Sequence, residues 1–175
     1  MDSFKELYLG NLSRYEPKVK RWTKKFHYYF RRSQTCTNKI LKYYYSFRYK
    51  MIRKNRGLEI PSNLSVGKGL YIGHPYNITI NGTAVLGKNI NIHKGVTIGQ
   101  ENRGKRNGAP TIGNNVWIGI NSIIVGKITI GDDVLIAPGA YVNCNVPSHS
   151  IVLGNPCKII PKENATQDYI NHTVD

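Results

Sequence analysis

The residue best placed to do chemistry is His74, in the stretch GLYIGHPYNITINGTAV at positions 69–85. An imidazole titrates near neutral pH, so it can take a proton from a substrate and later return it. His74 also lies where a regular pattern of aliphatic residues is interrupted. The other histidines are less distinctive: His93 follows in NIHKG, His149 belongs to a turn in VPSHS, and His27 and His172 lie outside the pattern.

The aliphatic pattern has a period of six residues and begins at Ile60. An amphipathic helix repeats every three or four residues and a strand every two, so neither explains this spacing. A short fixed period indicates a solenoid, and a parallel β-helix with stacked inward aliphatic residues is the simplest one. The positions are Ile60, Val66 and Ile72, then Ile80, Leu86, Ile92 and Ile98, then Ile112, Ile118, Ile124, Ile130, Ile136 and Val142.

The period breaks twice. Two extra residues separate Ile72 from Ile80, and this break contains His74. Eight extra residues separate Ile98 from Ile112, where the polar loop GQENRGKRNGAPT occupies positions 99–111. Because insertions in a solenoid become loops on its faces, we expect functional residues at both breaks and expect both to line one edge.

Residues 1–57 carry most of the charge. They contain sixteen Lys and Arg against three acidic residues, which is +13 of the chain's +15. Pro17 could open a helix through KVKRWTKKFHYYFRR, and the helical spacing of Ile40, Tyr44, Phe47 and Met51 predicts a second helix. We therefore expect a basic helical segment at 1–57, a β-helix domain at 58–160 and a C-terminal tail at 161–175.

Two further features bear on location. No apolar run reaches the length of about 18 residues that a membrane span needs. The N-terminus MDSFKELYLG lacks the layout of a signal peptide, so we expect a cytoplasmic protein, which the basic segment could bring to the inner face of the cytoplasmic membrane. Cys36, Cys144 and Cys157 fit no metal or disulfide spacing, so we interpret them as reduced structural residues and expect no metal.

The stretch IGNNVWIGINSIIVGKITIGDDVLIAPGA, at 112–140, resembles the hexapeptide-repeat signature of left-handed β-helix acyltransferases. The closing VPSHSIVLGNPCKII, at 146–160, is similar to that family's exit from the helix. The resemblance implies a mainly β fold: a left-handed parallel β-helix of about four coils, roughly 19 Å long, with an α-helical N-terminal segment. It also implies a homotrimer.

Within that family, residues 69–100 look most like the serine acetyltransferase branch. The resemblance places His74 on that branch's catalytic histidine, and Glu59 where the branch carries the aspartate that orients the histidine. A hydroxyl attacks a thioester poorly until its proton is removed, so His74 would act as the general base. The carboxylate would fix the tautomer of the imidazole.

The resemblance also implies acetyl-CoA as the co-substrate, lying in a groove between neighbouring β-helices. Backbone groups of the later coils would hold it, and a basic residue would contact its phosphates. The matching positions are Gly119, Ile120, Pro138 and Asn143 for the backbone groups and Lys158 for the phosphates. Candidates for substrate contact are His93, Arg106 and Trp117, although His93 could simply occupy a corner and Trp117 could seal the trimer.

This sequence departs from the serine acetyltransferase branch at two places where serine would be recognised. Gly73 replaces the acidic residue that usually precedes the catalytic histidine, and NGAP at 107–110 replaces an arginine-histidine pair. Burying the ammonium and carboxylate of serine without partners is costly. We therefore predict an acetyl-CoA-dependent O-acetyltransferase for a sugar of bacterial surface polysaccharide, capsule or O-antigen. The alternatives are a serine O-acetyltransferase of cysteine biosynthesis and a non-catalytic β-helix binding or scaffold protein.

The basic segment has three interpretations. It could contact an anionic membrane that carries a lipid-linked glycan, attract an acidic glycan directly, or form a solvated face beneath the trimer. Nucleic-acid binding is not expected, because no recognised motif accompanies the charge.

Overall fold

The computed structural model describes residues 3–175 and begins with three helices, α1 (Phe4–Ser13), α2 (Arg21–Thr35) and α3 (Lys39–Lys54). The sequence analysis expected two. It missed α1, whose signal is a capping box in which Ser3 and Glu6 satisfy each other's backbone N–H groups. Helix α2 begins at Arg21 and not directly after Pro17. Within the described residues, no helix is long and apolar enough to cross a membrane.

Three sheets follow, here called faces A, B and C. Each strand of a face is hydrogen-bonded to the next strand in the order given. Face A holds β1 (Leu58–Glu59), β4 (Ile78–Ile80), β7 (Thr97–Gly99), β10 (Ile123–Val125) and β13 (Tyr141–Val142). Face B holds β2 (Ser65–Val66), β5 (Val85–Leu86), β8 (Thr111–Ile112) and β11 (Thr129–Ile130). Face C holds β3 (Tyr71–Gly73), β6 (Asn91–His93), β9 (Val116–Ile118), β12 (Val134–Ile136), β14 (Ser150–Leu153) and β15 (Lys158–Pro161).

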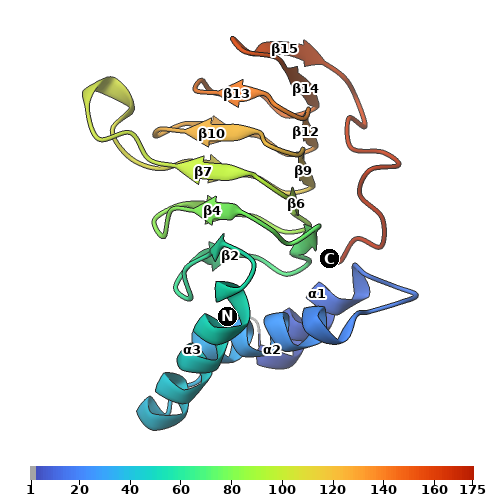
Figure 1. Cartoon of the computed structure of the whole chain (residues 1–175). Coiled ribbons are helices and arrows are strands. Elements are labelled where there is room, and N and C mark those ends of the chain that lie inside the picture. The colour runs from blue at the N-terminus through green and yellow to red at the C-terminus, as the bar shows by residue number, and fades with distance from the viewer. Residues whose placement is uncertain (1–2) are drawn as a thin grey trace.

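The chain visits faces A, B and C in turn, which makes a three-sided parallel β-helix of about five turns (Figure 1). The expected count of about four is one too low. The first turn already begins at β1, and the last turn uses the bridge between Ile130 and Val146 together with β14. The sequence analysis had assigned those last residues to the exit from the helix. Strand β15 then runs antiparallel to β14 and ends the stack.

The six-residue repeat forms the core, as predicted. Twelve of the thirteen repeat positions are buried, and Val66 is half-buried. Partners lie directly above one another: Ile72 pairs with Ile92, Ile92 with Ile118, and Ile118 with Ile136. Burying an aliphatic side chain of this size contributes about 1.5–3 kcal/mol, so every added turn stabilises the one beneath it.

Helices α2 and α3 pack under the first turn. Phe26 and Phe30 of α2 and Tyr49 of α3 are fully buried there, and the Tyr49 hydroxyl donates to the carbonyl of Ile60 at 2.9 Å. The residues whose spacing predicted the second helix, Ile40, Tyr44, Phe47 and Met51, face solvent, with exposures from 48% to 81%. The packing face is the one that carries Tyr49, and Arg53 of the same helix donates to the same carbonyl at 2.8 Å.

His27 joins the helices to the β-helix. It is fully buried, with Nδ1 3.0 Å from the Asn11 amide nitrogen and Nε2 3.0 Å from the Tyr15 hydroxyl. The same hydroxyl accepts a hydrogen bond from the backbone N–H of Ile72 at 2.6 Å. Burial, helped by the charge of Arg31, lowers the pKa of His27 from 6.5 to about 3.

This histidine makes stability depend on pH. Between pH 6.5 and about 3 the folded chain keeps His27 neutral while the unfolded chain protonates it. The unfolded state therefore binds more protons, and we expect the free energy of unfolding to fall with decreasing pH by up to about 1.4 kcal/mol per pH unit. Urea unfolding at several pH values would measure this. His27→Gln should flatten the profile, and an unchanged profile in that variant would contradict the assignment.

Candidate functional site

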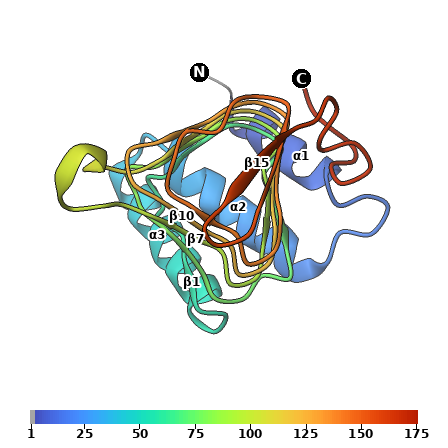
Figure 2. The ribbon, with the colours of Figure 1, turned by 90° about the horizontal axis from the view of Figure 1, so that it is seen from above.

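A cavity of about 620 Å³ lies beside the first turns of face C, between the β-helix, the α1–α2 connection and the C-terminal tail. Figure 2 shows α1 and the tail on the same side of the β-helix. Three parts of the chain line this cavity. They are Arg14, Tyr15, Glu16, Lys18, Lys20, Trp22, Thr23 and Arg56 from the helical segment, Tyr71, Ile72, Gly73, His74, Pro75, Tyr76, Asn91, His93 and Trp117 from the β-helix, and Tyr169, Asn171 and His172 from the tail.

His74 lies directly after β3, at the turn from face C to face A. Its φ of +52° is in the left-handed region, and its side chain is exposed at the cavity. The two inserted residues widen this turn, and the N–H of Tyr76 closes it by donating to the carbonyl of His74 at 2.8 Å. The Arg56 guanidinium lies 4.7 Å from the ring centre of Tyr76 and 4.4 Å from that of Trp22. The interruption therefore presents the imidazole outward from a well-packed turn.

His93 is the neighbour of His74 on the next turn. Their ring centres are 6.5 Å apart, and the His93 ring packs against Trp117 at 4.8 Å. Burial, together with the nearby His74, lowers the pKa of His93 and keeps it neutral at neutral pH. Its Nε2 is buried and has no hydrogen-bond partner among the described residues. A neutral imidazole with one unused nitrogen can hydrogen-bond a ligand in the cavity.

Gly73 explains how His93 fits. Gly73 and His93 are paired across β3 and β6, and a Cβ atom on Gly73 would lie 2.6 Å from Nδ1 of His93. No side chain fits at that distance unless the imidazole moves. The ring of His93 thus occupies the space into which a larger residue at position 73 would extend.

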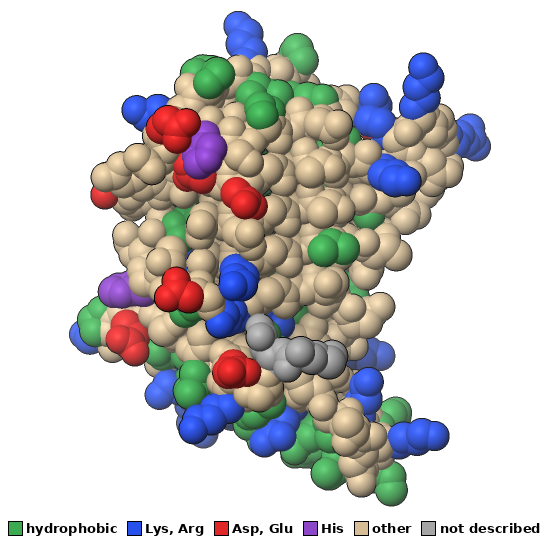
Figure 3. Space-filling view, turned by 180° about the vertical axis from the view of Figure 1, so that it is seen from behind, with side chains coloured by type: hydrophobic (Ala, Val, Ile, Leu, Met, Phe, Trp, Pro, Cys, Tyr) green, Lys and Arg blue, Asp and Glu red, His purple; other side chains and the backbone are tan. Residues whose placement is uncertain are grey.

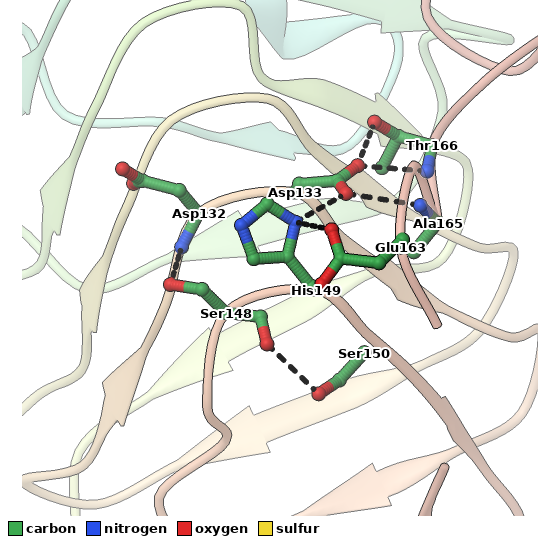
Figure 4. A network of polar contacts seen from close by, with 8 residues as sticks. All are labelled: Asp132, Asp133, Ser148, His149, Ser150, Glu163, Ala165 and Thr166. Carbon is green, nitrogen blue, oxygen red and sulfur yellow. Dashed lines mark hydrogen bonds and ion pairs between the residues drawn. The ribbon is translucent and has the colours of Figure 1, made fainter. Parts of the chain in front are cut away.

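The C-terminal tail is anchored by Asp133 (Figure 4). Its carboxylate accepts hydrogen bonds from the N–H groups of Ala165 and Thr166 at 3.0 and 2.9 Å, and from the Thr166 hydroxyl at 2.7 Å. Nδ1 of His149 lies 2.9 Å from Asp133 and 3.4 Å from Glu163. The hydrogen bond to Asp133 raises the pKa of His149, whereas for Asp133 burial is outweighed by these hydrogen bonds and the pKa falls. His149, predicted as a turn residue, also helps hold the tail.

Beyond this anchor the tail becomes a wall of the cavity. Tyr169 packs against Trp117 with ring centres 5.1 Å apart, and its carbonyl accepts a hydrogen bond from the Asn91 side chain at 3.1 Å. The buried Arg14 guanidinium donates to the carbonyl of Asn171 and to the Asn91 side chain, and burial lowers its pKa to about 10. The sequence analysis missed these tail residues, because nothing in their spacing relates them to the repeat.

Glu59 lies elsewhere in the single chain. It is exposed on β1, and its Oε2 accepts a long hydrogen bond of 3.4 Å from the Thr79 hydroxyl. It lines a second cavity of about 700 Å³ beside α3, whereas His74 lines the first. No hydrogen bond joins Glu59 to His74 among residues 3–175, so their pairing stays a prediction.

The residues proposed for acetyl-CoA fall into two groups. Gly119 and Ile120 follow β9 and Pro138 follows β12, so all three lie on the C-to-A edge that also carries His74. Turns along this edge are tied together, for example by the N–H of Gly139 and the carbonyl of Ile120 at 2.9 Å. Asn143 instead follows β13 on the A-to-B edge, and Lys158 lies exposed in β15.

The inserted loop does not share an edge with His74, which corrects the expectation that both breaks line one edge. It leaves β7 of face A and enters β8 of face B, and it projects away from the tail (Figure 2). Arg106 lies in its short 3-10 helix, Gly104–Arg106, and pairs with Glu101 at 3.1 Å. Arg106 does not line the cavity of its own chain, whereas His93 and Trp117 do.

A family model and a curated protein that are similar to this chain are both transferases. The model described as bacterial transferase hexapeptide (six repeats) matches residues 109–144. Over 130 residues the chain is 33% identical to serine acetyltransferase 2 of Arabidopsis thaliana, which covers 68% of this chain and 40% of that protein. The chain thus spans less than half of this relative's length.

Two solved structures are similar over most of the chain. The serine acetyltransferase of Neisseria gonorrhoeae in complex with serine aligns with a TM-score of 0.68 at 28% identity, covering 90% of this chain and 69% of that one. The serine acetyltransferase of Brucella abortus strain S19 in complex with coenzyme A aligns with a TM-score of 0.69 at 26% identity, covering 91% and 67%.

The contact between Gly73 and His93 can be tested by a double-mutant cycle. We expect Gly73→Ala to destabilise the protein by about 1–3 kcal/mol, because the new methyl group overlaps the imidazole. His93→Ala removes the ring, so the double variant should be more stable than the sum of the two single effects predicts. Urea unfolding of the four proteins measures the coupling, and strictly additive effects would show that the two positions do not interact.

Proposed function

The chain belongs to the bacterial transferase hexapeptide family, and we propose that it is an O-acetyltransferase that moves an acetyl group from acetyl-CoA to a hydroxyl group. The observation that carries this proposal is the position of His74. Its imidazole stands at a break in the β-helix, at a cavity, on the edge that also carries Gly119, Ile120 and Pro138. About three turns, or roughly 14 Å, separate His74 from Pro138 along that edge.

In this proposal His74 acts first as a base and then as an acid. Its imidazole removes the proton from the acceptor hydroxyl as the oxygen attacks the thioester carbonyl. The tetrahedral intermediate then collapses, and the proton passes from His74 to the departing CoA thiolate. His93, whose pKa is lowered, stays neutral and offers its unused Nε2 to the acceptor. Glu59 would orient His74 after giving up its long hydrogen bond to Thr79.

Acetyl-CoA would lie along the C-to-A edge, with its reactive end towards His74. The relative from Brucella was solved with coenzyme A, which supports this co-substrate. Backbone groups at Gly119, Ile120 and Pro138 would bind the extended part of acetyl-CoA, and Lys158 would contact its phosphates. We further propose a homotrimer, in which the groove lies between neighbouring β-helices and Arg106 acts at a neighbour's site.

L-Serine is the acceptor that the relatives favour, since the plant protein is named a serine acetyltransferase and the Neisseria enzyme was solved with serine. The cavity contains complementary charges for an amino acid. Glu16 could pair with the ammonium group, and Lys18, Lys20 or Arg56 with the carboxylate. This reading reverses the preference of the sequence analysis for a sugar.

A sugar hydroxyl is the second candidate, and the aromatic lining of the cavity favours it. Rings of Trp22, Tyr71, Tyr76, Trp117 and Tyr169 line the cavity, and flat apolar rings suit the faces of a sugar. Gly73 also lacks the acidic side chain that the serine branch carries before its catalytic histidine. A sugar hydroxyl acceptor carries no ammonium group, so it would not need an acidic side chain at position 73.

Release of free CoA thiol from acetyl-CoA tests the reaction and the acceptor together. We expect serine or a sugar from a panel to accelerate release, and His74→Ala to lower that rate by about 10²–10⁴-fold, the usual contribution of a general base. An unchanged melting temperature of the variant would show that the fold is intact. Activity retained in His74→Ala would contradict the proposed base, and no release with any acceptor would favour a non-catalytic scaffold.

We also propose that the basic helical segment binds an anionic lipid surface. Six apolar side chains of α3 are exposed: Ile40, Leu41, Tyr43, Tyr44, Phe47 and Met51. Positions 17–58 contain fourteen Lys and Arg and no acidic residue. Figure 3 shows basic and hydrophobic side chains together at the helical end of the molecule. A second copy would repel this charge, whereas anionic lipid attracts it and also accepts apolar side chains.

Sedimentation with vesicles tests this surface. We expect the protein to bind vesicles that contain phosphatidylglycerol, to bind pure phosphatidylcholine much less, and to release as salt rises. Phe47→Glu with Met51→Glu should abolish binding, whereas Ile160→Glu, an equally exposed site on β15, should not. Failure of the unaltered protein to bind, or a loss of oligomer mass in the α3 variant with binding intact, would contradict the proposal.

A further inference from the structure

Two cysteines that are 13 residues apart in the sequence meet at the last turn of the β-helix. Cys144 follows β13, and Cys157 lies in the connection between β14 and β15. Their sulfur atoms are 3.8 Å apart, and both thiols are free. The third cysteine, Cys36, follows α2 at the other end of the molecule. Both thiols of the pair are reduced in the structure, and the solenoid brings the two segments that carry them together.

The backbone around the two thiols is held in place. The N–H of Tyr141 donates to the carbonyl of Gly154 at 3.1 Å, which links the two segments directly. Leu153 is paired with Lys158 across β14 and β15, and Val142 is paired with Ile124 of β10. A disulfide requires sulfur atoms about 2.05 Å apart. Formation of the bond therefore requires the two sulfur atoms to approach from 3.8 Å to that distance.

The pair is open to reagents in solution. Cys144 is exposed and Cys157 is half-buried. Burial and the hydrogen bond with Cys157 raise the pKa of Cys144, although the Arg106 guanidinium acts in the opposite direction. Since the thiolate is the form that attacks a disulfide, a raised pKa means that the reaction is slow at neutral pH and accelerates as the pH rises.

We propose that Cys144 and Cys157 form an oxidisable dithiol whose reaction partner is a low-molecular-weight disulfide. The Cys144 thiolate attacks one sulfur of the reagent, forms a mixed disulfide and releases one thiolate. The Cys157 thiolate then attacks the sulfur of Cys144 and releases the second. Both cysteines lose their protons and are oxidised, and the reagent is reduced to two thiols. The evidence for this dithiol does not rest on the proposed acetyl transfer.

The site sits beside two residues of the acetyl-CoA proposal. Asn143 directly precedes Cys144, and Lys158 directly follows Cys157. A disulfide would tie the connection between β14 and β15 to the turn after β13. The oxidised form would therefore hold Asn143 and Lys158 in one fixed relation.

Oxidised glutathione is the probe for the test. After incubation, we expect the number of titratable thiols in the unfolded chain to fall from three to one and the intact mass to fall by two hydrogen atoms. Dithiothreitol should restore both values, and raising the pH should speed the change. Peptide mapping should join Cys144 to Cys157. None of these three readouts requires acetyl-transfer activity, so this test is separate from that of the enzyme.

Three serine variants make the test specific. Cys157→Ser should stop at a stable mixed disulfide between glutathione and Cys144, and Cys144→Ser should form no internal disulfide. Cys36→Ser is the matched control and should still form the bond, leaving no free thiol. Persistence of three thiols in the unaltered protein, or accumulation of a mixed disulfide that Cys157 does not displace, would overturn the proposal.

Discussion

The stacking of inward aliphatic side chains in register is the interaction on which the rest of this structure depends. Each inward side chain is removed from water only when another turn lies above or below it. One such column consists of Ile72, Ile92, Ile118 and Ile136. Parallel pairing on three faces supplies the backbone hydrogen bonds at the same time. The helices α2 and α3 close the lower end of this stack, and β15 closes the upper end.

Because the stack is so regular, function is confined to the places where it is interrupted and to the edges between faces. The two residues added after Ile72 do not disturb the core, since Ile72 and Ile80 are both buried, but they turn His74 outward. The longer insertion leaves from a different edge and carries Arg106 away from its own chain's cavity. An oligomer in which edges of neighbouring chains meet would give both insertions a common site.

The cavity at His74 is built from three distant parts of the chain. Arg14, in the segment between α1 and α2, donates hydrogen bonds to Asn91 of the β-helix and to Asn171 of the tail. Asp133 holds the tail at a later turn of the β-helix. The pair Gly73 and His93 shows the same principle at short range. The imidazole of His93 on one turn takes the space of a side chain at position 73 on the turn below. The effect of the residue at position 73 on acceptor choice therefore depends on His93 as well.

The sequence by itself determined the β-helix, the residues of its core and the outward position of His74, because a six-residue period and its breaks are local properties that every turn repeats. Only the tertiary structure decided which face of α3 is buried, that the tail walls the cavity, and that Cys144 lies beside Cys157. It also decided that Glu59 and His74 line different cavities of one chain. These relations depend on how the helices, the tail and the individual turns pack together, which a six-residue spacing does not specify.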